Sequence, residues 1–385
     1  MPEKTHRRPE VTANELYVGL MSGTSLDAVD VALVRCTPGN CALLATLEYP
    51  IAPEMRRAIA AISSTGDDEI ERLGRLDREL GTLFANAALA LLASTRYECT
   101  DIAAVGSHGQ TIRHRPPSAG NVPAFTLQIG DPNTIAELTG ITTVADFRRR
   151  DIAAGGEGAP LAPGFHASAF AREGRGRAIV NIGGIANITL LSGTRLLSGF
   201  DTGPGNTLLD HWTERHRGQA YDRDGEWAAT GQVDAALLQQ LRGHPYLARR
   251  GPRSTGKEAF NIAWLESCLQ SLPAIAPQDV QATLAEFTAD TIAGAVISAE
   301  PEMTEVYVCG GGARNADLMR RLQRLLAPRH LDTTAALGID PDWVEAAAFA
   351  WLAWCTLNGL AGNAAAVTGA AGARVLGGIY PGGGN

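Results

Sequence analysis

Three short apolar segments near the start of the chain predict strands, and two longer segments with helical periodicity follow them. The strands are Leu16–Leu20, Val29–Cys36 and Cys41–Tyr49, with Pro38-Gly39-Asn40 as a hairpin turn, and the helices lie at about Pro53–Ser63 and Glu69–Ser94. A further buried strand, Ile102–Ser107, runs into a polar, glycine-containing stretch. This order predicts an antiparallel meander followed by helices and another strand.

A second set of elements repeats the same order. It comprises strands at Ala178–Ile182, Asn187–Leu191, Leu196–Phe200 and Val306–Cys309, and helices at about Thr207–Arg217, at Gln281–Ala299 and from near Asn315. A duplicated meander with helices favours an α/β fold of two ribonuclease-H-like lobes, the actin-like ATPase arrangement, with a cleft between the lobes. Two unrelated α/β domains would give the same pattern.

These patterns also predict how the chain divides. We expect a flexible tail at 1–15, lobe I at 16–147 plus about 367–385, and lobe II at 148–366. The hinge is expected near 145–160, where a basic cluster runs into a glycine-rich stretch. The strand-like segment Val375–Tyr380 is expected to return to lobe I.

Composition narrows the possible partners. The chain has 385 residues, 45% of them hydrophobic, with 41 acidic and 33 basic side chains and a net charge of −8. This balance indicates a globular protein and argues against nucleic acid as a partner. The six cysteines are scattered without metal-ligand spacing, and neither a signal peptide nor a membrane span is recognisable. We therefore expect a reduced, cytoplasmic protein.

Small residues and glycines mark two candidate nucleotide contacts. The turn after the first strand offers a concavity of backbone N–H groups for phosphate and is formed by Ser22, Gly23, Thr24, Ser25, Leu26, Asp27, Ala28, Val29 and Asp30. Asp27 is a candidate Mg²⁺ ligand there. Gly310, Gly311 and Gly312 join a buried strand to a helix and would let a nucleotide approach the backbone. Gly251–Lys257 has P-loop spacing, but Glu258 replaces the required Ser or Thr, so we reject that interpretation.

Polar side chains at other strand ends suggest catalysis and sugar binding. Asp201 follows a strand in a Gly/Pro turn, where a carboxylate suits either general-base chemistry or helix capping. His108, Gln110 and Thr111 suit hydrogen bonds to a sugar. Of the three successive arginines at 148–150, at most one or two should face a site.

Seven motifs together resemble the anhydro-N-acetylmuramic acid kinase family, from about Tyr17 to Pro381. They are GLMSGTSLD (19–27), GSHGQTIRH (106–114), ELTGITTVADFRRRDIAAGGEGAPLAP (137–163), NIGGIANIT (181–189), GFDTGPGN (199–206), STGKEAFN (254–261) and CGGGARN (309–315). The resemblance implies the actin-like sugar-kinase fold. It also implies a reaction in which 1,6-anhydro-N-acetylmuramic acid, ATP and water give N-acetylmuramic acid 6-phosphate and ADP, in cell-wall sugar recycling.

The resemblance also implies roles for residues. Asp201 would activate water for attack on C1, and residues 23–30 and 310–312 would contact ATP. His108, Gln110 and Thr111 would line the sugar site. Arg148 to Arg150 would be candidates for binding the lactyl carboxylate or a phosphate. Glu345 would be a candidate sugar contact, although an acid at this position could also simply stabilise the helix N-terminus. ATP, Mg²⁺ and a small sugar are the implied ligands, and a homodimer is plausible.

One departure from the family pattern and three alternatives stay open. Ala28 stands where the family usually has Gly. Alanine can replace glycine there without strain only if the backbone φ is negative. The alternatives are a sugar kinase acting on an ordinary hydroxyl, a non-catalytic nucleotide-binding sensor of the same fold, and a plain glycosidase.

Overall fold

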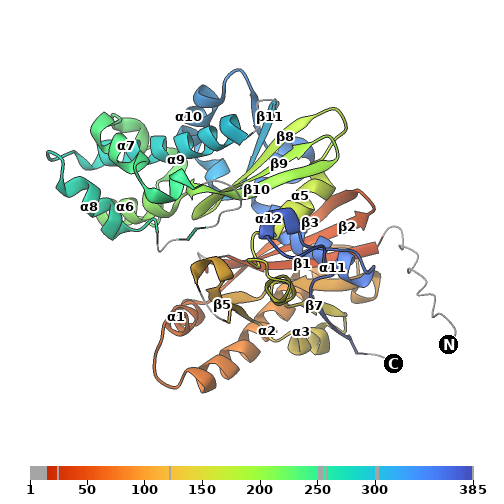
Figure 1. The fold of residues 1–385 in the computed structure, drawn as a ribbon. Coiled ribbons are helices and arrows are strands. Elements are labelled where there is room, and N and C mark those ends of the chain that lie inside the picture. The colour runs from red at the N-terminus through yellow and green to blue at the C-terminus, as the bar shows by residue number, and fades with distance from the viewer. Residues whose placement is uncertain are drawn as a thin grey trace. The chain divides into compact units, whose positions relative to one another are not determined.

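The computed structural model describes residues 15–23, 26–120, 123–249, 255–256, 259–299 and 303–383. The chain forms two compact units. Unit 1 is Met1–Ala169 with Glu345–Asn385, and unit 2 is Phe170–Val344. In Figure 1, the elements of unit 1 are coloured red to yellow and, near the C-terminus, dark blue. The elements of unit 2, which come between these two segments in the sequence, are coloured green to blue. The predicted tail at 1–15 lies outside the described residues, except for Glu15, which begins the first strand.

A six-stranded sheet in the order β13-β7-β4-β1-β2-β3 forms the centre of unit 1. Its strands are β1 (Glu15–Ser22), β2 (Ala28–Thr37), β3 (Asn40–Pro50), β4 (Ile102–Ser107), β7 (Thr143–Ala145) and β13 (Gly378–Tyr380). The first three strands form the predicted antiparallel meander, while β4 and β7 are parallel to β1. β13 pairs with β7, so the C-terminal segment returns to the first unit as predicted.

Helices and a small second sheet complete unit 1. They are α1 (Pro53–Ile62), α2 (Glu69–Ala93), α3 (Pro132–Thr139), α4 (Arg149–Ala153), α5 (Ala162–Phe170), α11 (Val344–Leu357), α12 (Ala365–Thr368), β5 (Gln110–Arg115) and β6 (Phe125–Ile129). β5 and β6, which the sequence pattern did not predict, pair as an antiparallel ribbon directly after β4.

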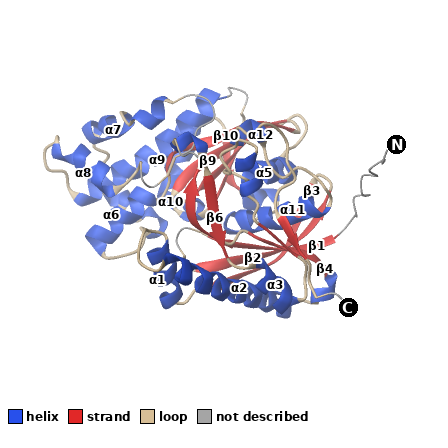
Figure 2. Cartoon of the chain, turned by 60° about the horizontal axis from the view of Figure 1, so that its bottom comes forward, coloured by secondary structure: helices blue, strands red, loops and turns tan. Residues whose placement is uncertain are grey.

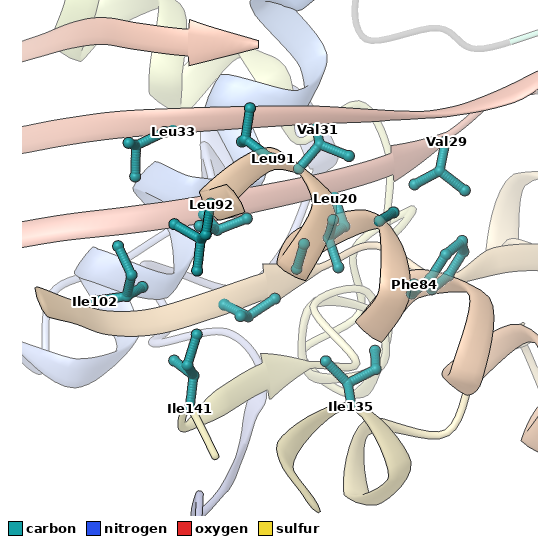
Figure 3. Packing of buried hydrophobic residues seen from close by; sticks show 14 of the residues in the cluster. Leu20, Val29, Val31, Leu33, Phe84, Leu91, Leu92, Ile102, Ile135 and Ile141 are labelled. Carbon is teal, nitrogen blue, oxygen red and sulfur yellow. The ribbon is translucent and has the colours of Figure 1, made fainter. Parts of the chain in front are cut away.

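Helices α2 and α3 cover one face of the large sheet (Figure 2). The apolar side of α2 packs Phe84 and Leu91 against Leu20 and Val31, and all four side chains are fully buried. Figure 3 shows these side chains meeting between α2 and the strands. Burying each such side chain contributes about 1.5–3 kcal/mol, so this layer stabilises the position of β1 in the sheet.

Helix α11 packs against the opposite face. Successive strand residues point to opposite sides, so Gly19 and Gly106 face away from α2, and both lie against α11. A Cβ at Gly19 would lie 1.9 Å from the Ala346 carbonyl oxygen, and one at Gly106 would lie 2.0 Å from that of Phe349. Only glycine allows this close approach of helix and sheet.

The unit boundaries differ from those expected from the sequence. Residues 148–169 and 345–366 were assigned to lobe II, but both segments belong to unit 1. The reason lies in long-range packing, because α11 needs the glycines of β1 and β4. In addition, the buried Asp151 carboxylate accepts hydrogen bonds from Asn363 and Thr368.

Unit 2 contains a five-stranded sheet in the order β10-β9-β8-β11-β12. Its elements are β8 (Gly176–Ile182), β9 (Ile185–Ser192), β10 (Arg195–Pro204), β11 (Glu305–Cys309), β12 (His330–Thr333), α6 (Thr207–Arg217), α7 (Ala235–Arg242), α8 (Ile262–Gln270), α9 (Pro277–Ala299) and α10 (Ala316–Leu326). One core lies between the sheet and α9 and α10. A second core joins α6, α7, α8 and α9.

The two sheets repeat one topology. In each, a three-stranded antiparallel meander is extended by two parallel strands next to the first strand of the meander. This is the ribonuclease-H-like strand order, and its duplication confirms the predicted α/β fold class. Within the described residues, no helix is long and apolar enough to cross a membrane.

Candidate active site

The turn after β1 is where the sequence predicts phosphate contacts. Ser22 closes β1 opposite Val29 and is almost fully buried, and its hydroxyl oxygen has no hydrogen-bond partner among the described residues. Thr24 and Ser25 lie outside those residues. The residue at positive φ is Leu26 (φ 59°), whereas Ala28 begins β2 without one. A methyl group at position 28 is therefore compatible with the turn.

Asp27, the candidate Mg²⁺ ligand, is exposed in this turn. Its carboxylate forms an ion pair with Arg56 at 2.8 Å. No group of three or more His, Cys, Asp or Glu side chains in the described part of the chain could hold a metal ion. Mg²⁺ commonly binds through one or two carboxylates together with substrate phosphates and water. One exposed carboxylate beside the turn predicted to contact phosphate fits that mode of binding.

His108 lies just beyond the end of β4, and its backbone N–H donates to the Leu20 carbonyl of β1. The ring is buried and contacts Phe349 with the centroids 4.8 Å apart. Its Nε2 lies 3.0 Å and 3.3 Å from two guanidinium nitrogens of Arg148. Arginine can only donate, so Nε2 is the acceptor and the ring is neutral. Burial, and then the Arg148 charge, hold the pKa of His108 well below its usual range.

Arg148 is the one of the three successive arginines that points inward. Besides contacting His108, it donates to the Gly158 carbonyl at 2.9 Å. Burial lowers the pKa of Arg148 to about 10, and the carboxylates of Glu345 and Asp151 act in the opposite direction. The guanidinium therefore stays protonated at neutral pH. Arg149 and Arg150 are exposed.

The other predicted sugar contacts of unit 1 lie on β5 and at the start of α11. Gln110 is buried at the start of β5, and its side-chain oxygen has no partner among the described residues. Thr111 accepts a hydrogen bond from Gln128 of β6 at 3.0 Å. Glu345 lies in the first turn of α11 and is exposed. Thus the structure brings His108 and Arg148 into direct contact, with Glu345 close enough to influence the guanidinium.

Asp201 lies in β10 of unit 2, opposite Asn187, at a bulge between Asp201 and Gly203. It is buried, one carboxylate oxygen accepts from the Thr255 backbone N–H at 2.8 Å, and its carbonyl accepts from the Tyr246 hydroxyl at 2.7 Å. A bulge turns a side chain away from the regular ladder and is common beside active sites.

The capping interpretation of Asp201 is wrong, because the residue before α6 is Asn206. The segment containing Thr255 was quoted as a motif, but no local pattern linked it, or Tyr246, to Asp201. Most of the rejected P-loop segment, residues 251–254 and 257, lies outside the described residues.

Three glycine turns of unit 2 gather at one edge of its sheet. The N–H groups of Gly205 and Asn206 donate to the carbonyls of Gly184 and Gly183. Gly310 (φ 76°) and Gly312 pack against the end of β8, and a Cβ at either would lie 2.3 Å from a side-chain atom of Asn181 or Ile182, respectively.

Close packing against the end of β8 therefore explains why positions 310 and 312 are glycines. Gly311 is exposed, and the nearest atom to a Cβ there would be the side-chain nitrogen of Asn206 at 3.8 Å. Of the three glycines predicted to contact the nucleotide, Gly311 is the one whose backbone is open.

Comparison with known proteins identifies the family of the chain. The chain matches the family described as anhydro-N-acetylmuramic acid kinase over residues 15–382. It is 52% identical over 365 residues to the anhydro-N-acetylmuramic acid kinase of Shewanella sp. (strain ANA-3), covering 94% of this chain and 98% of that protein. It is 50% identical over 366 residues to the enzyme of that name from Pseudomonas putida, covering 95% and 99%.

Solved structures resemble the chain more distantly. An activator of 2-hydroxyisocaproyl-CoA dehydratase from Clostridium difficile with bound ADPNP has a TM-score of 0.45 at 14% identity, covering 88% of this chain and 94% of that chain. A ROK family glucokinase from Streptomyces griseus in complex with glucose and AMPPNP has a TM-score of 0.37 at 14% identity, covering 87% and 99%.

The duplicated ribonuclease-H-like topology, with a small-residue turn on its first strand, defines the actin-like ATPase and sugar-kinase class. Within that class, the chain belongs to the anhydro-N-acetylmuramic acid kinase family. The resemblance inferred from the seven motifs is thereby confirmed.

Proposed function

We propose that this protein is a kinase that opens and phosphorylates 1,6-anhydro-N-acetylmuramic acid in cell-wall sugar recycling. Water adds to C1 of the sugar, the bond from C1 to O6 breaks, and O6 takes the γ-phosphoryl group of ATP. The products are N-acetylmuramic acid 6-phosphate and ADP. The family membership supports this reaction, and the position of Asp201 supports its chemistry.

Asp201 is proposed as the general base. Its carboxylate is buried at the bulge of β10, and the Thr255 N–H fixes one of its oxygens. It would take one proton from the attacking water, while the other proton remains on the new C1 hydroxyl. Phosphoryl transfer to O6 then replaces the proton that a general acid gives to the leaving group in ordinary glycoside hydrolysis.

The nucleotide is proposed to be held by the turn after β1, residues 22–30, and by residues 310–312. Backbone N–H groups suit the phosphates, and the exposed Gly311 suits close approach of the nucleotide. Asp27 would hold Mg²⁺ together with the phosphates. When bound, the ion neutralises charge on the transferring phosphoryl group.

The sugar is proposed to contact His108, Gln110, Thr111, Arg148 and Glu345. Arg148 is the preferred partner for the lactyl carboxylate, because its guanidinium stays charged. Neutral His108 holds that guanidinium in place and cannot act as an acid near neutral pH. Exposed Arg149 is the less suitable candidate for this contact.

The direct test compares ADP release with the anhydro sugar and with free N-acetylmuramic acid. We expect turnover only with the anhydro sugar, and ¹⁸O from labelled water at C1 of the product. Equal rates with both sugars would instead identify an ordinary sugar kinase. Ring opening without ATP would identify a glycosidase.

Asp201→Asn tests the proposed base. Removing a general base lowers kcat by roughly 10²–10⁴-fold, while the affinity for ATP should be unchanged. Asp224→Asn is the matched control, because Asp224 is an exposed aspartate of the same unit. A protein whose full function survives Asp201→Asn would be a nucleotide-binding sensor.

A cytoplasmic location is part of the proposal. All six cysteines are free thiols, including Cys36 and Cys41, whose sulfurs lie 3.6 Å apart across the β2–β3 hairpin. Unbonded neighbouring thiols suit a reducing compartment. The homodimer implied by the family resemblance stays a prediction, and size-exclusion chromatography with light scattering would test it.

A further inference from the structure

The proposed base, Asp201, lies on a strand that has a neighbouring strand on one side only. β10 forms one edge of the five-stranded sheet, and its pairing with β9 is interrupted by the bulge between Asp201 and Gly203. Sheet edges leave backbone groups without a strand partner, and bulges disrupt the ladder locally. Contacts from outside the sheet must therefore help to fix the position of Asp201.

Two such contacts come from a later part of the same unit. The hydroxyl of buried Tyr246 donates to the backbone carbonyl of Asp201 at 2.7 Å. The Thr255 N–H donates to one carboxylate oxygen of Asp201 at 2.8 Å. One bond holds the backbone of Asp201 and the other holds its side chain, so together they give the carboxylate a defined direction.

Aromatic packing fixes Tyr246 itself. The residue lies in the single helical turn Pro245–Ala248, and its backbone N–H donates to Nδ1 of His244 at 3.2 Å. The ring meets fully buried Phe260 edge-on, with the centroids 5.9 Å apart. Phe260 also contacts the His244 ring at 4.4 Å between centroids. Because the ring is held independently of its hydroxyl, a phenylalanine at position 246 should pack in the same way.

The hydroxyl of Tyr246 therefore has a separable effect. A general base must lie within hydrogen-bond reach of the proton that it removes, and a misplacement of about 1 Å can cost roughly 100-fold in rate. The hydroxyl contacts the backbone of Asp201 and not its carboxylate. Its influence on the reaction would thus pass through the position of that carboxylate.

We propose that Tyr246 is a positioning residue, whose hydroxyl holds the bulged backbone of β10 so that the Asp201 carboxylate meets the attacking water. This inference rests on the proposed function, since it takes Asp201 as the base. It implies that the Tyr246 hydroxyl contributes to the chemical step and not to the binding of ATP or the sugar.

Tyr246→Phe tests the proposal, because it removes the hydroxyl and keeps the ring. We expect kcat to fall about 10- to 100-fold, while the KM values for ATP and for the anhydro sugar stay within a few-fold of the wild type. The loss of one buried hydrogen bond should lower Tm by only about 2–4 °C. Assays well below this Tm separate the effect on kcat from unfolding.

Tyr307→Phe is the matched control. Tyr307 is a buried tyrosine of the same unit, and its hydroxyl also makes one hydrogen bond, to the Glu305 carboxylate at 3.3 Å. Glu305 begins β11, whereas the glycines proposed to contact the nucleotide follow the other end of that strand. This variant should lose a similar few degrees in Tm and leave kcat unchanged.

A double-mutant cycle with Asp201→Asn distinguishes positioning from a merely structural role. Radiolabelled ATP measures the residual turnover of Asp201→Asn with tyrosine or phenylalanine at position 246. If Tyr246 acts through the Asp201 carboxylate, the two residual rates should be equal within about twofold, because no base is left to position. A structural role would instead lower turnover by the same factor in both backgrounds.

The outcomes separate this inference from the function on which it rests. If the wild-type protein releases no ADP with the anhydro sugar, the proposed function fails and the role of Tyr246 fails with it. If the wild type turns over but Tyr246→Phe reduces kcat no more than Tyr307→Phe does, or equally with and without Asp201, only the positioning role is overturned and the kinase assignment stands.

Discussion

Replacing Asp151 by alanine should destabilise unit 1 severely, although the residue lies in a stretch that looks like a polar hinge. Its carboxylate is completely buried and accepts hydrogen bonds of 2.8 Å from the Gly158 N–H, the Asn363 amide and the Thr368 hydroxyl. These bonds tie the segment after α4 to the chain around α12. The Gly158 carbonyl in turn anchors Arg148.

The magnitude follows from the groups left behind. Asp151→Ala leaves three buried donors without an acceptor, each costing about 1–3 kcal/mol. Removing one partner of a buried charged network typically costs about 3–5 kcal/mol. We therefore expect a loss of about 4 kcal/mol in the free energy of unfolding, or roughly 8–16 °C in Tm for a unit of this size. Asp151→Asn keeps one acceptor oxygen and should lose about half as much.

Urea denaturation of the full chain, followed by circular dichroism, measures this loss. Asp67→Ala, at an exposed position, is the control and should stay within about 0.5 kcal/mol of the wild type. An Asp151→Ala protein within about 1 kcal/mol of the wild type would refute the argument, because the buried carboxylate would then not hold these segments together.

Other substitutions probe separate contacts. Gly106→Ala should cost at least about 1–3 kcal/mol, because its Cβ would meet the α11 backbone. Gly74→Ala, at an exposed position of α2, should stabilise the protein by about 0.4–1 kcal/mol. Burial lowers the pKa of His166 to about 3, so this one residue should make stability fall by about 1.4 kcal/mol per pH unit below about 6.5, and the fall should be less steep by that amount in His166→Gln. Arg148→Lys should raise the KM for the sugar about tenfold, since lysine cannot bond two partners in one plane, whereas exposed Arg150→Lys should not.

Each of these predictions has a result that would contradict it. Equal melting temperatures for Gly106→Ala and the wild type would show that α11 does not approach the sheet closely. Parallel stability curves between pH 7 and pH 5 would show that His166 takes up a proton in the folded protein. An unchanged sugar KM in Arg148→Lys would remove Arg148 from the sugar site.

Local pattern was enough to predict most of the sheet strands and the family. The apolar run Val31–Val34 predicts a strand segment buried on both faces, and all four of these residues of β2 are buried. The small-residue and glycine turns could be predicted from the sequence, because backbone conformation and limited space restrict which residue types can occupy them. The order of these turns along the chain indicated the duplicated fold.

Other features depend on contacts between distant residues. The β5–β6 ribbon, the assignment of α11 to unit 1 and the bond between Asp201 and Thr255 join segments that no sequence window contains together. The same is true of the inward orientation of Arg148, which its neighbours do not share.

The sequence by itself therefore determined the local elements, the order of the turns and the residue types available for chemistry, because periodicity and steric restriction act over a few residues. Only the tertiary structure decided that Asp151 is a buried anchor and that the Tyr246 hydroxyl meets the Asp201 carbonyl. Burial and hydrogen bonding of those side chains are set by elements far apart in the chain, and these elements come together only when the sheet and its helices pack.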